Sequence, residues 1–436
     1  MGDPRTIELL YGRGTLPLNL PADAQATVIR KQALPKLPDP AQAIQEAFDQ
    51  PIGSLPLSEL AKGRRSACVV VCDITRPVPN GLFLRPMIER MLAAGIERQA
   101  ITVLVACGLH RPNEGDELAE LIGDPWVLDN IRVVNHLARD EAGLVDLGVT
   151  ESRGVPVVLN RLLVEADLRI VTGLVEPHFM AGWSGGRKVV APGVAGQRTI
   201  RTFHNASFME DPLAVQCNLA GNPLHQAQLE IVARVGELYA LNTVLDEDRD
   251  LVRVTFGEIE ASHLAAIDFV AQSTCPKVSR RFSTVVTSAA GYPLDKTYYQ
   301  TVKGMVTPID ILQPGGDLII VSECSEGFGS PEFRRSQARL VELGPDRFLA
   351  SIADKALADV DEWQTEMQLK PMRLGRIQLY TGGLDEAERR ITGVELIDSI
   401  DRAVADSIAR SGDPAVAVVP EGPYVIPVFG GPDQAV

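Results

Sequence analysis

The sequence predicts an α/β protein of two domains with largely parallel sheets flanked by helices. Its 436 residues exceed what one ordinary hydrophobic core accommodates. Hydrophobic residues make up 45% of the chain and charged residues 23%, as is typical of a globular protein. Short runs rich in Val and Ile alternate with longer amphipathic stretches. Continuous apolar strands separated by helices are typical of a parallel sheet that is covered on both faces.

The expected elements fall into two series. In the first, strands are expected at 67–74, 100–107, 131–134, 155–159 and 168–171, and helices at 81–94, 115–121 and 224–240. In the second, strands are expected at 283–288, 317–322, 377–380 and 394–397, with a last strand at 415–419. Thr274-Cys275-Pro276-Lys277 interrupts a helix expected over 262–271, which indicates a domain boundary. We therefore predict a first domain over 1–272, to which 412–436 returns, and a second over 280–411.

Charge and cysteine content exclude several classes of protein. The net charge of −15 argues against nucleic acid as a main partner, because phosphate neutralisation needs a basic surface. No apolar run approaches the ~18 residues of a membrane span, and the N-terminus has no secretory pattern. Six scattered cysteines without a C-x-x-C indicate a reducing compartment and no structural zinc or iron–sulfur site. We expect a cytoplasmic protein that binds neither nucleic acid nor membrane; a homo-oligomer is compatible with the sequence.

A glycine-rich segment is the most informative part of the chain. It runs from Glu176 to Gly193 and places His178, Arg187 and Lys188 among four glycines, Gly182, Gly185, Gly186 and Gly193. Glycines permit left-handed backbone, and their N–H groups can form anion-binding nests. A flexible surface loop is the alternative, but it would not need Phe179, Met180 and Trp183 between the polar groups. The segment therefore indicates a site built around a bound cofactor.

Three further polar segments also follow predicted strands. They are Asp73-Ile74-Thr75-Arg76-Pro77, Gly108-Leu109-His110-Arg111-Pro112 and Gly291-Tyr292-Pro293-Leu294-Asp295-Lys296. In open α/β sheets, ligands bind beyond the carboxyl ends of the strands. We therefore expect these segments and the glycine-rich one to share a pocket in the cleft between the domains.

Three of the six histidines lie in or beside these segments. His110 and His178 each follow a strand end, and imidazole suits acid–base work near neutral pH. His204 is expected on a helix whose inward face also carries Ile200, Phe203 and Ser207. An inward histidine is often a satisfied core group, so that alternative stays open for His204. The other three, His136, His225 and His263, are interpreted as structural.

Cationic side chains complete the candidate chemistry. Arg76 is placed for bidentate contact with a carboxylate, although it could instead be a surface arginine paired with Asp73. Gln300 and Lys303 are spaced i, i+3 on a helix expected from Tyr298 to Gly304, and a solvated helix face is their alternative. Lys188 precedes an apolar run, and a lysine in apolar surroundings can become nucleophilic and hold a cofactor covalently. The chain has no G-x-G-x-x-G, no G-x-x-x-x-G-K-[ST] and no G-x-S-x-G.

Taken in order, these motifs resemble the nickel-pincer-nucleotide lactate racemase family of 2-hydroxyacid racemases and epimerases. The resemblance is carried by Asp73-x-Thr75-Arg76-Pro77, Gly108-x-His110-Arg111-Pro112, Glu176-Pro177-His178 through Gly185-Gly186-Arg187-Lys188, His204-Asn205, and Gly291-Tyr292-Pro293-Leu294-Asp295 with Gln300 and Lys303. It extends from Asp73 to Trp363. Each motif alone is weak, whereas the ordered set is specific.

The resemblance implies a two-domain α/β enzyme whose first domain carries most of the catalytic and cofactor-binding residues. The implied cofactor is a pyridinium-3-thioamide-5-thiocarboxylic acid mononucleotide with nickel, supplied by cofactor-synthesis enzymes and attached covalently at Lys188. His204 would ligate nickel, and His110 and His178 would form the acid–base pair. The remaining implied contacts are Arg76, Lys303, Gln300, Trp363 and Tyr299 for the substrate, and Asp73, Thr75, Gly185, Gly186 and Arg187 for the cofactor.

The implied reaction inverts the C2 centre of a small 2-hydroxy acid. One histidine takes the hydroxyl proton while hydride leaves the α-carbon for the cofactor, which gives a bound 2-keto acid; hydride return to the other face inverts the centre. Two alternatives stay open from the residues alone. One is a zinc-type hydrolase that uses His110, His178 and His204, and the other is a non-catalytic nucleotide- or phosphate-binding protein.

Overall fold

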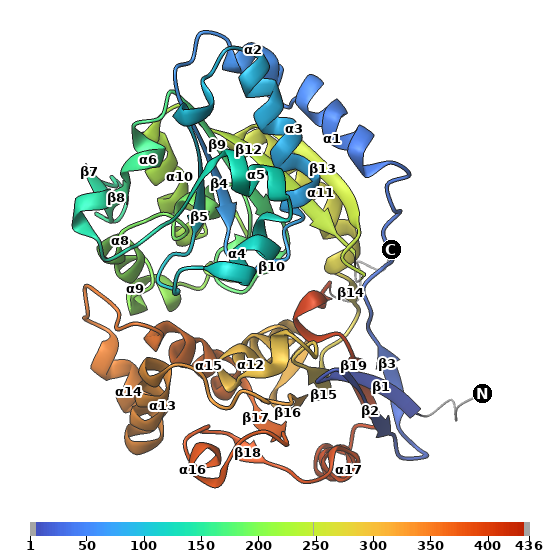
Figure 1. Ribbon diagram of the computed structural model, residues 1–436. Helices are drawn as coiled ribbons and strands as arrows, with labels where there is room; N and C mark the ends of the chain where they lie inside the picture. Colours follow the sequence, from blue (N-terminus) through green and yellow to red (C-terminus); the bar gives the residue numbers. More distant parts are fainter. Residues whose placement is uncertain (1–5, 247, 431–436) are drawn as a thin grey trace. The chain divides into compact units, whose positions relative to one another are not determined.

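A computed structural model describes residues 6–246 and 248–430, which form two compact α/β units (Figure 1). The His110 unit, named after its candidate base, comprises 33–203 and 213–271. Within the described residues, the Trp363 unit comprises 6–32, 204–212 and 272–430. The predicted fold class, two domains with mostly parallel sheets and flanking helices, is confirmed. Within the described residues, none of the helices combines the length and apolar character that crossing a membrane requires.

The His110 unit is built on a six-stranded sheet in the order β13-β12-β9-β4-β5-β6. Its strands are β4 (Ala67–Cys72), β5 (Ile101–Ala106), β6 (Arg132–Asn135), β9 (Leu168–Leu174), β12 (Tyr239–Leu245) and β13 (Leu251–Glu258). All neighbours are parallel except β12 and β13. The central strands β4 and β5 are almost wholly buried, which explains why their sequences are continuous apolar runs rather than alternating ones.

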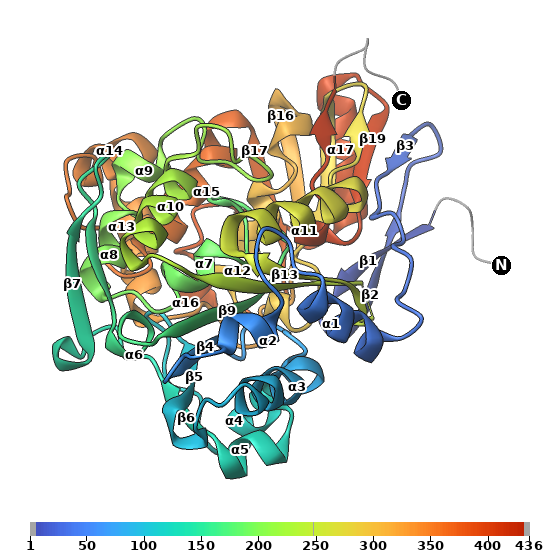
Figure 2. The same cartoon turned by 90° about the horizontal axis from the view of Figure 1, so that it is seen from above.

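Helices cover both faces of this sheet. Figure 2 shows α1 (Pro40–Asp49) and α3 (Asn80–Ala93) over one face, with α10 (Pro223–Val235) and α11 (Ile259–Thr274) over the other. Phe48 and Phe83 of the first pair pack with Val69 of β4 in one apolar core. The start of α10 is fixed by Asn222, whose side chain accepts hydrogen bonds from two backbone amides of the first turn.

The Trp363 unit has its own six-stranded parallel sheet, in the order β18-β17-β16-β15-β19-β3. Its strands are β3 (Gln25–Val28), β15 (Phe282–Ser288), β16 (Leu312–Val321), β17 (Arg376–Tyr380), β18 (Glu395–Leu396) and β19 (Ala415–Val419). A hairpin of β1 (Thr6–Tyr11) and β2 (Gly14–Asn19) packs its apolar residues into the same core. The helices that matter for the site are α12 (Tyr298–Val306), α13 (Pro331–Leu343), α14 (Pro345–Ile352) and α15 (Glu362–Leu374).

The predicted return of 412–436 to the first domain is wrong for its described part, 412–430, and residues 431–436 lie outside the described residues. Strand β19 pairs with β15 on one side and with β3 on the other, both in the Trp363 unit. All five residues of β19 are buried, so the strand needs a neighbour on each side, and β3 with its exposed side chains forms the edge. Residues up to Gln32 therefore belong with the C-terminal sheet and not with the domain predicted over 1–272.

Two expected elements also differ. The strand expected at 155–159 is β8 (Pro156–Asn160), which pairs antiparallel with β7 (Leu144–Val149) in a separate two-stranded sheet. The helix expected over 224–240 ends at Val235, because Gly236 adopts a left-handed φ of 88°, and β12 follows from Tyr239. The residues from 224 to 240 are divided between helix α10 and the start of strand β12. Hydrophobic periodicity alone does not show where the helix ends and the strand begins.

Candidate active site

Two predicted site residues meet where β4 and β5 end. These strands are parallel neighbours with Cys72 opposite Ala106, so the loops that follow them leave the same edge of the sheet. Asp73 Oδ2 lies 2.6 Å from His110 Nδ1, and the Thr75 hydroxyl donates to Asp73 Oδ1 over 2.5 Å. Since an ionised carboxylate only accepts, His110 carries its proton on Nδ1 and presents Nε2 as an acceptor. Its side chain is 64% exposed.

The Asp73 carboxylate is charged despite its burial. Burial alone would raise the pKa of this carboxyl, which is only 5% exposed. The hydrogen bonds from His110 and Thr75, with the charge of Arg76, outweigh burial and hold the pKa of Asp73 below its ordinary value. The ionised Asp73 carboxylate therefore places a negative charge next to Nδ1 of the exposed His110 ring.

Arg76 reaches the end of a third strand. Its guanidinium forms an ion pair with the Glu176 carboxylate, which follows β9, and both side chains are partly buried. Arg76 thus pairs with Glu176, and its charge also acts on the Asp73 carboxyl. Three of the four predicted strand-end segments come together in the His110 unit, as their shared sheet edge predicts.

His178 is held differently from His110. It lies in a short hairpin of β10 (Pro177–His178) and β11 (Gly182–Trp183), and its ring is buried. Nδ1 accepts hydrogen bonds from the backbone amides of Met180 and Ala181, at 3.3 and 3.2 Å. The neutral ring therefore carries its proton on Nε2. The two histidines consequently engage their Nδ1 atoms in opposite senses, one as donor and one as acceptor.

Lys188 lies in the short helix α7 (Arg187–Val190), directly after the glycines. It is partly exposed, whereas its neighbours Arg187 and Val189 are buried. Gly185 and Gly186 have φ of 78° and 48°, values that side chains rarely adopt, so this turn requires glycine. The Arg187 guanidinium, 1% exposed, donates to the carbonyl of Ala181 over 2.9 Å and to that of Trp183 over 3.3 Å. Arg187 thus contacts the loop itself from inside.

The Trp363 unit gathers the remaining predicted site residues. His204 is buried, and its ring lies against Trp363 of α15 with the ring centroids 4.8 Å apart. The expected helical face for His204 is wrong, because α8 (Gln197–Thr202) ends before it and Asn205 caps α9 (Ala206–Met209). His204 is inward because the link between two short helices turns it there.

Helix α12 carries Tyr299, Gln300 and Lys303. Burial raises the pKa of the Tyr299 phenol far above its ordinary value, and its hydroxyl also interacts with the side chains of Asp361 and Trp363. Gln364 Nε2 donates to the Tyr299 carbonyl over 2.6 Å, which ties α12 to the start of α15. Gln300 Oε1 is buried and accepts no hydrogen bond from the described residues. This side-chain amide is the one predicted substrate contact that the fold leaves with an unsatisfied buried oxygen atom.

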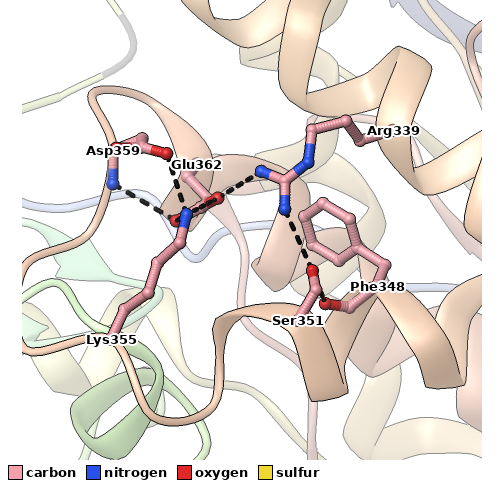
Figure 3. Close-up of polar contacts among 6 residues, drawn as sticks. All are labelled: Arg339, Phe348, Ser351, Lys355, Asp359 and Glu362. Atoms are coloured by element: carbon pink, nitrogen blue, oxygen red, sulfur yellow. Dashed lines mark hydrogen bonds and ion pairs between the residues drawn. The ribbon is translucent and has the colours of Figure 1, made fainter.

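An ion cluster fixes the first turn of α15, just before Trp363 (Figure 3). The buried Glu362 carboxylate accepts from Lys355 Nζ at 2.8 and 3.0 Å and from Arg339 of α13 at 2.8 Å. Lys355 also bonds Asp359 over 2.8 Å, and Arg339 donates to Ser351 of α14 over 2.9 Å. Three helices are therefore joined at the residue that precedes the predicted substrate contact.

The fourth predicted segment, Gly291 to Lys296, has a structural role within the Trp363 unit. Asp295, fully buried, accepts hydrogen bonds from the backbone amides of Gly12 at 2.7 Å and Glu323 at 3.1 Å. It anchors the β1–β2 turn, so the Gly291–Lys296 motif supports the unit's own structure. A cavity of about 600 Å³ in the His110 unit, lined by Leu55, Leu229 and Tyr239 among others, contains none of the predicted site residues.

Sequence reasoning missed several polar residues around the site. Glu176 was quoted in the motif but given no role, although it pairs with Arg76. Asn242 and His263 contact the glycine-rich loop from β12 and α11. Asn242 left a signal in the sequence, since it is the amide within the apolar run from Tyr239 to Leu245. His136 is structural as predicted: its ring bonds the Ala195 carbonyl and the Asn160 side chain.

Comparison with known proteins decides the family. Residues 11–216 match the lactate racemase N-terminal domain, and residues 279–427 match the lactate racemase C-terminal domain. The lactate racemase of Lactiplantibacillus plantarum is 32% identical over 428 residues, covering 96% of this chain and 99% of that protein. The chain belongs to the lactate racemase family. It is accordingly an enzyme of the isomerase class, a racemase.

Other relatives agree with this membership. The lactate racemase of Thermoanaerobacterium thermosaccharolyticum is 29% identical over 426 residues, covering 96% of this chain and 98% of that protein. The solved structure of the lactate racemase apoprotein from that organism matches with a TM-score of 0.89 at 27% identity, covering 97% of this chain and 99% of that one. A crystal structure of a Thermotoga maritima protein, at 18% identity and a TM-score of 0.67, covers 91% of this chain and 100% of its own and shows the fold alone.

Proposed function

We propose that this racemase inverts the C2 centre of a 2-hydroxy acid, with His110 and His178 as its acid–base pair. The observation that carries the proposal is the Asp73–His110 pair, in which a buried charged carboxylate orients an exposed imidazole. A hydroxyl proton passes to His110 Nε2, and the Asp73 charge stabilises the imidazolium that results. Removal of that proton and of a hydride from C2 converts the 2-hydroxy acid into a 2-keto acid.

His178 serves the opposite face in this proposal. For Nε2 to give up a proton while the ring ends neutral, Nδ1 must carry one as well. Nδ1 accepts from the amides of Met180 and Ala181, so it takes a proton only when the ring turns away from them. We therefore expect the His178 ring to change its contacts in each turnover, whereas His110 keeps its partner.

Binding of the substrate carboxylate is assigned to Arg76 and Lys303. Arg76 already binds a carboxylate, that of Glu176, and its planar guanidinium suits bidentate contact. Gln300, whose buried Oε1 lacks a partner among the described residues, would bind a donor such as a hydroxyl group of the ligand, with Tyr299 and Trp363 shaping the wall.

The residues fit a covalently held nickel-pincer nucleotide. Lys188 offers a partly exposed amine between buried neighbours, and the imidazole of His204 is a suitable nickel ligand. Asp73 and Thr75 follow β4, Gly185 packs against Leu174 and Val175 at the end of β9, and Arg187 supports the loop from within. When bound, the nucleotide supplies the acceptor and donor for the hydride. Enzymes that make the cofactor are then the required partners.

The test expresses the chain beside cofactor-making enzymes and measures intact mass, nickel content and interconversion of lactate enantiomers. Lys188→Ala should abolish the mass adduct, whereas Lys62→Ala, an exposed lysine of the same unit, should keep it. His110→Ala should keep the adduct and lose racemisation. An adduct that survives Lys188→Ala refutes attachment there, and full turnover in His110→Ala refutes the base.

The same measurement separates the alternatives. Stoichiometric zinc without an adduct would favour a zinc-type hydrolase. Nucleotide binding without any change in optical rotation over a panel of 2-hydroxy acids would favour a binding protein. The zinc-type alternative is disfavoured by His178, because its Nδ1 accepts from two backbone amides and its Nε2 therefore carries a proton instead of a free lone pair.

A further inference from the structure

A layer of buried polar side chains supports the glycine-rich loop that precedes Lys188. It consists of Asn242 on β12, His263 on α11 and Arg187 at the start of α7, all of which are buried. Parallel sheets normally pack apolar residues against their helices, so three polar side chains at one such position need a reason. Each of them contacts the segment from Ser184 to Gly186 or the hairpin before it.

His263 makes the tightest of these contacts. Its Nε2 lies 2.6 Å from the Ser184 carbonyl and therefore donates to it, which leaves Nδ1 to accept from Arg187, 3.3 Å away. The ring also packs directly on Gly186, where an added Cβ would lie 2.7 Å from the imidazole Cγ. Burial, followed by the charge of Arg187, lowers the pKa of His263 well below its ordinary value, so the ring is neutral. The neutral ring therefore connects the Arg187 guanidinium to the Ser184 carbonyl of the loop.

Asn242 holds the loop through its backbone. Its Oδ1 accepts from the Gly186 amide over 3.1 Å, and its Nδ2 donates to the Ser262 hydroxyl over 3.2 Å. Ser262 in turn donates to the Ala240 carbonyl over 3.3 Å. The Asn242 amide is thus fixed by its neighbours on β12 and α11, and it offers one defined acceptor to the glycine turn.

Arg187 pulls the preceding hairpin onto the same layer. Its guanidinium binds the carbonyls of Ala181 and Trp183 together with the His263 ring. Burial lowers the pKa of Arg187 to about 9, so it remains charged at neutral pH. Its Nε has no hydrogen-bond partner among the described residues, so the two carbonyls and the His263 ring hold the charge through the other guanidinium nitrogens. A buried charge is costly unless it is hydrogen-bonded, and such networks favour one conformation over many. The layer therefore orients the loop more sharply than an apolar contact would.

We propose that His263 and Asn242 are positioning residues that preset the Ser184–Gly186 backbone and so hold the Lys188 amine in its orientation for covalent attachment. The proposal rests on the proposed function in one respect, the attachment of the cofactor at Lys188. The Lys188 amide donates to the Gly185 carbonyl over 3.0 Å, so a displaced glycine turn moves the lysine with it.

The test compares His263→Leu, which removes both ring nitrogens, with His263→Gln, whose amide nitrogen replaces Nε2. Acetic anhydride labels the amines of the cofactor-free protein, and peptide mass spectrometry gives the labelling rate of Lys188 relative to Lys62. Intact mass after expression beside cofactor-making enzymes gives the adduct occupancy. Ile44→Ala, a truncation in the apolar core under α1, is the matched control for lost stability without a change in the loop.

We expect His263→Leu to raise the relative labelling of Lys188 at least threefold and to lower adduct occupancy at least fivefold. His263→Gln should return both within twofold of the wild type, and Ile44→Ala should leave both unchanged at a temperature where it is folded. Wild-type labelling and occupancy in a folded His263→Leu protein, or equal changes in Ile44→Ala, would overturn the proposal. If His263→Leu does not fold, Asn242→Ala is judged by the same two measurements. An absent adduct in the wild type would count against attachment at Lys188, while the labelling rates would still decide whether the layer positions the loop.

Discussion

Replacing Asp73 with Asn tests the base assigned to His110. The substitution keeps the size of the side chain and removes its charge. An Asn oxygen still accepts from His110 Nδ1–H if the amide nitrogen turns to the Thr75 hydroxyl, so the ring orientation survives and the lost quantity is the charge. A hydrogen bond to a charged group is worth about 1.5–3 kcal/mol, which corresponds to a rate loss of about 10- to 150-fold.

The assay measures kcat for lactate in both directions with the cofactor-loaded protein, after intact mass has shown equal adduct in each variant. Asp167→Asn is the control, because Asp167 bonds Arg65 at the surface of the same unit. A wild-type kcat in Asp73→Asn would show that the carboxylate does not stabilise an imidazolium during the reaction. If Asp73→Asn lowers only the amount of adduct and leaves the kcat of the loaded protein unchanged, the role of Asp73 is in binding the cofactor instead.

Two further predictions concern stability. Glu362→Gln should lower the free energy of unfolding of the Trp363 unit by about 1–3 kcal/mol, less than the ~3–5 for a fully buried pair because Lys355 and Arg339 are partly hydrated; an unchanged midpoint in urea would contradict this. His136 tests pH dependence: burial lowers its pKa from 6.5 to about 4, so the unfolded chain takes up the proton first as the pH falls. Its contribution, about 3 kcal/mol, is complete above pH 6.5 and is lost towards pH 4. His136→Gln should flatten urea midpoints over that range, and identical pH slopes would refute the assignment.

Local pattern predicted most strands of both sheets but missed β12, β13 and β3. The runs at β4 and β5 are apolar because these strands are buried on both faces, and an apolar run indicates burial. Pattern did not show which sheet a strand joins. Strand β19 is as apolar as β5, and only its pairing with β15 and β3 places it in the Trp363 unit. Pairing partners distant in sequence leave no local signature.

For the candidate site, too, some features could be predicted from the sequence and others could not. Asp73, His110 and Arg76 were found because the carboxyl ends of parallel strands share an edge, a rule that needs only the order of elements. The sequence did not show which ring nitrogen of each histidine carries the proton. His110 Nδ1 donates to a carboxylate, whereas His178 Nδ1 accepts from two backbone amides. His263 was set aside as a helix residue, because nothing local reveals that its ring rests on Gly186.

The placement of β3 has a consequence for synthesis of the chain. Gln25 to Val28 are translated long before their hydrogen-bonding neighbours, Ala415 to Val418. Almost all of the His110 unit is made between these two events and can bury its sheet during elongation. Strand β3 has no partner through that interval, and its short length and exposed side chains, two of which are polar, limit wrong pairing with other edges.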